Sequence, residues 1–67
     1  MKLTIDSEDQ ALYFRLADDK DITESEEIQP GIIIDYDKDG NFIGLEILDI
    51  NKRFPQEMIK NFQFETI

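Results

Sequence analysis

Oxygen-bearing side chains near the middle of the chain match the pattern of a calcium-binding loop. Asp35, Asp37 and Asp39 alternate with other residues, a glycine follows, and Glu46 completes D-x-D-x-D-G-x5-E. Alternate carboxylates on a tight loop can surround a hard cation, and the last glutamate can add two oxygens. The alternative metal site that this pattern predicts has these ligands: Asp35, Asp37, Asp39, Asn41 and Glu46.

The flanking residues favour a hairpin over a metal loop. A calcium loop of this type lies between helices, but here the neighbours are Ile32–Ile34 and Leu45–Leu48, which are short and rich in strand-forming residues. A type I turn at Asp37–Gly40, with the glycine left-handed, would pair the two runs as strands. We therefore interpret the acidic stretch as a hairpin turn and predict no metal ion and no cofactor, with weak calcium binding at the tip as the alternative.

The expected register separates the candidate ligands. It places Tyr36 opposite Phe42, Ile34 opposite Gly44 and Ile32 opposite Glu46. Glu46 then lies roughly 13 Å along the strand from the turn. It also points to the opposite face of the sheet from Asp35. Glu46 would therefore be unable to reach a cation held at the tip.

The residues of the usual catalytic groups are missing. The chain has no cysteine and no histidine, so it lacks a thiolate nucleophile, a cysteine-based zinc site and the usual general base. Carboxylates are plentiful, and a carboxylate-based enzyme stays open as an alternative. We expect Glu46, which lies among apolar residues, to form an ion pair with Arg15 or Lys52. We predict that the protein is not an enzyme and name no catalytic residue.

The charge balance limits the partners. Sixteen acidic and seven basic residues give the 67-residue chain a net charge of -9. Nucleic acid and anionic membrane surfaces both favour a basic face, so neither is an expected partner. No apolar run approaches the roughly 18 residues of a membrane span, and no signal-peptide core is evident. We expect a cytoplasmic protein whose acidity suits solubility or a basic protein partner.

Side-chain periodicity predicts a small α+β domain. Residues 1–5 and 11–16 alternate as a hairpin, residues 22–28 suit a charged edge strand, and Pro30-Gly31 suits a type II turn. The runs 32–34 and 42–50 are apolar on both faces. We predict one domain over residues 1–67: an antiparallel β-meander of four to five strands in residues 1–50 and a helical segment in residues 51–67.

The C-terminal segment has helical spacing. Phe54, Met58 and Phe62 recur every fourth residue with Ile59 beside them, and Pro55 suits the first helical position. We predict a helix over residues 55–63 that packs on the sheet. One short helix covers only one face of a sheet whose strands are apolar on both faces, so we expect a homodimer to supply the other cover.

Several short stretches resemble the small prokaryotic proteins of domain-of-unknown-function family 2283. They are Ala11–Leu16, Pro30-Gly31, Asp35–Asp37 with Gly40, and Gly44–Asp49. The resemblance implies a small β-rich domain and no established activity, so it assigns no site residues. The function we expect is a non-enzymatic protein-interaction module, acting as an acidic antitoxin-like or adaptor partner of a basic protein.

Overall fold

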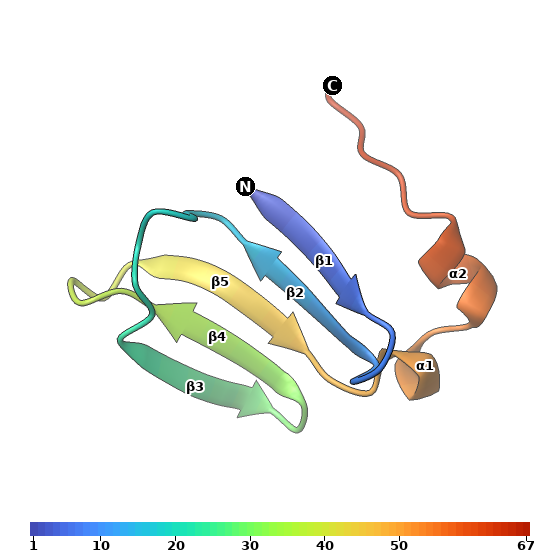
Figure 1. Ribbon diagram of the computed structural model, residues 1–67, viewed down its shortest axis with the longest axis horizontal. Coiled ribbons are helices and arrows are strands. Elements are labelled where there is room, and N and C mark those ends of the chain that lie inside the picture. The colour runs from blue at the N-terminus through green and yellow to red at the C-terminus, as the bar shows by residue number, and fades with distance from the viewer.

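The fold is a five-stranded antiparallel sheet followed by two short helices, which confirms the predicted α+β class. A computed structural model describes residues 1–67. Figure 1 shows the sheet face-on, with the strands in the order β1-β2-β5-β4-β3. The elements are β1 Lys2–Asp6, β2 Ala11–Arg15, β3 Glu24–Gln29, β4 Ile32–Tyr36, β5 Phe42–Ile47, α1 Ile50–Arg53 and α2 Gln56–Lys60.

The strands form two groups rather than one continuous meander. A hairpin joins β1 to β2, and β3, β4 and β5 follow one another through tight turns. The connection from β2 to β3 runs to the far edge of the sheet, so that β5 lies between β2 and β4 (Figure 1). The apolar strand β5 therefore takes the central position, and the charged strand β3 takes an edge as predicted.

The register beyond the β4–β5 turn differs from the predicted one by one residue. Tyr36 pairs with Phe42 as expected, but a bulge follows, and Asp35 rather than Ile34 then pairs with Gly44. Successive side chains of a strand point to opposite faces of the sheet. A one-residue shift therefore places side chains that were predicted on opposite faces on the same face. The prediction that Asp35 and Glu46 point to opposite faces is therefore wrong: both lie on the same face.

The two faces of the sheet differ sharply in polarity. Residues directly opposite each other in an antiparallel pair share a face, so the strand pairing assigns each side chain. One face, here called the polar face, carries Lys2, Thr4, Tyr13, Arg15, Asp35, Glu46 and Ser25, together with Ile33. The other, here called the apolar face, carries Leu3, Ile5, Leu12, Phe14, Leu45, Ile47, Ile34 and Ile32.

The C-terminal segment contains the predicted apolar stripe but does not cover the sheet. Within the expected helix over residues 55–63, the structure forms the shorter helix α2, and the short helix α1 precedes it as a separate element. Phe54, Met58, Ile59 and Phe62 line one apolar groove with Ile5, Leu12 and Ile50, at the end of the apolar face. Figure 1 shows both helices beside the end of β1, with the rest of the sheet uncovered.

Few side chains are fully buried in this single-layer arrangement. Of the 67 residues, six are buried, and the apolar ones are Ala11, Ile43 and Ile50. The isoleucines of β4 are only half-buried, so the predicted cover on both of its faces is absent from the single chain. None of the helices is both long enough and apolar enough to cross a membrane.

Candidate functional site

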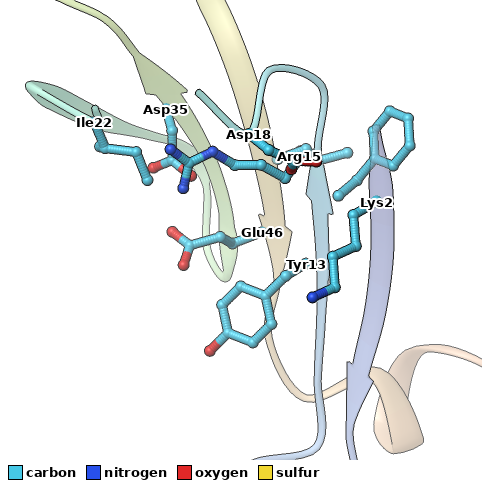
Figure 2. Close-up of a pocket in the computed structure, with 9 residues that line it drawn as sticks. Lys2, Tyr13, Arg15, Asp18, Ile22, Asp35 and Glu46 are labelled. Atoms are coloured by element: carbon cyan, nitrogen blue, oxygen red, sulfur yellow. The ribbon is translucent and has the colours of Figure 1, made fainter. Parts of the chain in front are cut away.

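The polar face contains a shallow hollow of about 290 Å³ that extends across β1, β2, β5 and β4. Its polar lining consists of Lys2, Tyr13, Arg15, Asp18, Asp35 and Glu46. Figure 2 shows the side chains of Tyr13, Arg15, Asp35 and Glu46 projecting from their strands to this one side of the sheet. The strand register brings them together, since Tyr13 pairs with Glu46, and Arg15 and Asp35 both pair with Gly44.

Asp35 is the most deeply buried ionisable group of the hollow, at 3% exposed. The Ser25 hydroxyl, one strand away on β3, donates a hydrogen bond of 2.7 Å to Asp35 Oδ1. On the other side, a Cβ at Gly44 would lie 3.2 Å from Asp35 Oδ2 and 3.4 Å from the Phe14 carbonyl oxygen. The missing side chain at Gly44 therefore leaves the space that the buried carboxylate occupies.

Glu46 lies on the same face and interacts with Asp35. Burial raises the pKa of Glu46, and the negative charge of Asp35 beside it raises the pKa further. Both influences favour the neutral form of an acid. Glu46 therefore takes up a proton at a higher pH than an ordinary glutamate.

The predicted ion pair of Glu46 with Arg15 or Lys52 is absent. The Arg15 guanidinium donates instead to the carbonyl oxygens of Ala17, at 3.3 Å from Nε, and of Lys20, which fastens the loop after β2. The ion pair that the structure does contain joins the amino terminus to Asp18 at 3.5 Å, with both groups largely exposed. Neither predicted cation reaches Glu46, because Arg15 is held by these loop carbonyls and Lys52 lies on α1, beyond the end of β5.

Tyr13 completes the hydrogen-bonding groups of the hollow. Burial raises the pKa of its hydroxyl, and the negative charges of Glu46, Asp9 and Asp6 raise it further. Tyr13 is thus a neutral donor across the physiological pH range.

Asp37, at the base of the β4–β5 turn, is occupied by the turn itself. Its Oδ1 accepts the backbone N–H groups of Asp39 and Asn41 at 2.9 Å each, and Oδ2 accepts the Asn41 side-chain amide at 3.2 Å. The hydrogen bonds from Asn41 lower the pKa of Asp37, outweighing the opposing effect of its burial at 8% exposed. Gly40 has a φ of 81°, which gives the left-handed bend predicted for the turn.

The five residues of the alternative metal site separate into two places. Asp37, Asp39 and Asn41 lie at the hairpin tip, whereas Asp35 and Glu46 lie on the polar face. The chain contains no group of three or more acidic side chains placed to hold a metal ion. A feature that the sequence did not predict is a second hollow, of about 300 Å³, where the β2–β3 loop passes the tip; its acidic lining is Asp19, Asp21, Asp37 and Asp39.

Comparison with known proteins agrees with the resemblance seen in the sequence. The family model described as protein of unknown function DUF2283 matches residues 2–51. The chain belongs to the DUF2283 family. No curated protein and no solved structure matches it. The matched region includes all five strands and the Asp35–Glu46 pair, and it ends as α1 begins.

Proposed function

We propose that this DUF2283 protein is a non-enzymatic interaction module that binds a basic protein partner, in the manner of an adaptor or an antitoxin. The observation that supports it best is strand β3, which is exposed along its whole length and carries Glu24, Glu26 and Glu27. This strand forms an edge of the sheet. A partner therefore meets a row of carboxylates together with an unpaired strand edge.

The backbone of β3 supports binding of an extended segment. An edge strand presents a row of free N–H and C=O groups, to which another strand can add. Glutamates along such an edge repel a second acidic strand, including the same strand of another copy. They attract a lysine- or arginine-rich segment, so the edge selects for the charge of its partner.

The acidic surface continues beyond β3. Thr23, immediately before the strand, lines the hollow at the hairpin tip together with Asp19, Asp21, Asp37 and Asp39. Only Lys20 and Lys38 are cationic there. A basic partner that follows β3 toward its first residue therefore reaches a second group of carboxylates.

A charge-neutralised variant tests this proposal. The partner is isolated from the native cell with the wild-type chain as bait, identified by mass spectrometry, purified and titrated by calorimetry. Combining Glu24→Gln, Glu26→Gln and Glu27→Gln is expected to weaken its binding by about tenfold or more, because the charge attraction is lost. A matched control removes the same charge elsewhere through Glu8→Gln, Asp9→Asn and Glu65→Gln. Equal weakening by both variants would contradict a role for β3.

The carboxyl pair supports a second candidate function, a carboxylate-based enzyme. The raised pKa of Glu46 beside buried Asp35 is the kind of perturbation that catalytic acids show. Hydrolytic activity that survives repurification and is abolished by Glu46→Gln would favour this candidate. Unchanged partner binding in Glu46→Gln, with no activity in the wild type, would favour the interaction module.

A further inference from the structure

The uncovered apolar face of the sheet is the largest feature that the proposed function does not use. Strands β1, β2, β5 and β4 contribute only leucine, isoleucine and phenylalanine to its central rows. On β1, β2 and β4, none of these apolar side chains is fully buried. Charged residues enter only at the border, where Glu24 and Glu26 of β3 pair with Tyr36 and Ile34. An apolar centre with a charged rim is the usual anatomy of a protein interface.

The solvent-accessible area of the chain exceeds that expected for a compact monomer of the same mass. The chain of 7.9 kDa exposes 5429 Å². A compact monomer of this mass exposes about 4,400 Å², so the excess is about 1,000 Å². Each partner in a stable interface of standard size buries about 800 Å². The excess is therefore sufficient for one such interface per chain.

We propose that a second copy of the chain packs on the apolar face, so that two sheets form a sandwich with the acidic edges outside. Two packed sheets share one apolar core, with the strands of each sheet roughly aligned. The same surface then serves both copies, as two-fold symmetry requires. The apolar groove of α1 and α2 extends this interface, because Ile5 and Leu12 belong both to the groove and to the apolar face.

The dimer leaves the backbone edge of β3 and the polar face free, and it places Glu24 and Glu26 at the rim of the interface. A dimer built in this way carries two acidic edges, and each can receive its own basic partner. The inference therefore goes beyond the proposed function and can fail separately from it. Loss of charge along β3 is expected to leave the dimer intact, whereas loss of the dimer is expected from changes on the apolar face.

Two neighbouring residues of β4 provide a matched test. Ile34 lies on the apolar face between Leu45 and Glu26, and Ile33 lies on the polar face between Glu46 and Glu27. Light scattering after size exclusion, from about 5 to 100 μM, is expected to give twice the chain mass for the wild type and for Ile33→Lys. Ile34→Lys is expected to give the mass of a single chain, with its strand content checked by circular dichroism.

A second pair covers the case in which the Ile34→Lys chain fails to fold. Leu3→Lys and Thr4→Lys place the same charge on opposite faces of edge strand β1, where the sheet tolerates change better. Only Leu3→Lys is expected to weaken the dimer, by about tenfold or more. A wild-type monomer at 100 μM would overturn the inference, whether the face then holds the chain's own C-terminal segment or a different protein. Dimers in all four variants would overturn it as well.

Discussion

At the scale of single residues, the most consequential contact is that between Asp35 and Glu46. Two acids on one face form a costly arrangement when both are charged, and here burial adds to the effect of charge on Glu46. The Ser25 hydroxyl and the space beside Gly44 accommodate Asp35 as the buried member. Burial and the charge of Asp35 consequently disfavour the charged form of Glu46.

Replacing Glu46 by glutamine is expected to stabilise the protein near neutral pH. The pKa of Glu46 in the folded state is raised above its ordinary value of 4.5, so the folded state binds the proton more readily than the unfolded state. The free energy of unfolding therefore falls as the pH rises from that ordinary value through the raised pKa. Glu46→Gln is expected to gain less than about 1 kcal/mol at pH 7, because solvent screens a half-exposed group.

Urea denaturation at pH 7 and at pH 3.5 measures this effect. The advantage of Glu46→Gln at pH 7 is expected to disappear at pH 3.5, where the wild-type glutamate is already protonated. Glu27→Gln removes the same charge from the exposed edge strand on the same face and serves as the control. Destabilisation by Glu46→Gln alone at pH 7 would indicate that the glutamate has a favourable partner and would contradict this account.

At the scale of elements, hydrogen bonds to Asp37 hold the β4–β5 turn together. One carboxylate satisfies two backbone N–H groups and the side chain of Asn41 within the turn. Asp37→Ala is expected to lower the urea midpoint clearly, whereas Asp39→Ala, which removes an exposed carboxylate from the same tip, is expected to change it little. Comparable losses in the two variants would argue against a special role for Asp37.

The pH dependence of this hairpin has the opposite sign to that of Glu46. Because the pKa of Asp37 is lowered in the folded state, its contribution is present above its ordinary value of 3.8 and is lost as the pH falls through the lowered pKa. The difference between wild type and Asp37→Ala is therefore expected to be largest near pH 7 and to shrink below pH 3. Addition of calcium at pH 7 provides a further check on whether the tip also binds a cation.

The sequence predicts the elements well because strands and turns are local. Alternation in residues 1–5 and 11–16, the left-handed glycine of the Asp37–Gly40 turn and the charged edge strand are all confirmed. The face of Glu46 was not predictable from alternation, since the bulge near Ile43 depends on how β5 fits between two other strands. Gly44 is the one local signal. A glycine within a strand indicates that a side chain from a neighbouring strand fills the space that its own side chain would occupy.

At the scale of the whole molecule, the order of the strands along the chain does not show which strands pair. Nothing local to β2 indicates that its partner is β5, far along the chain, because that pairing follows from burying the apolar strand in the centre. The short helices lie beside β1 instead of over the sheet. A single chain therefore has a complete sheet but only a thin core, and its stability as a monomer is expected to be marginal.

If two copies complete the core, folding and association are coupled, and thermal stability depends on protein concentration. Mass action stabilises a folded dimer as concentration rises, whereas a folded monomer is unaffected. From the usual unfolding entropy per residue, each tenfold rise in concentration is expected to raise Tm by about 5 °C. Calorimetry of the wild type from about 5 to 500 μM measures this slope, and Ile34→Lys is expected to remove it. A wild-type Tm that stays constant over this range would contradict coupling between the sheet and a second copy, and the sheet would then have to be stable with its apolar face open.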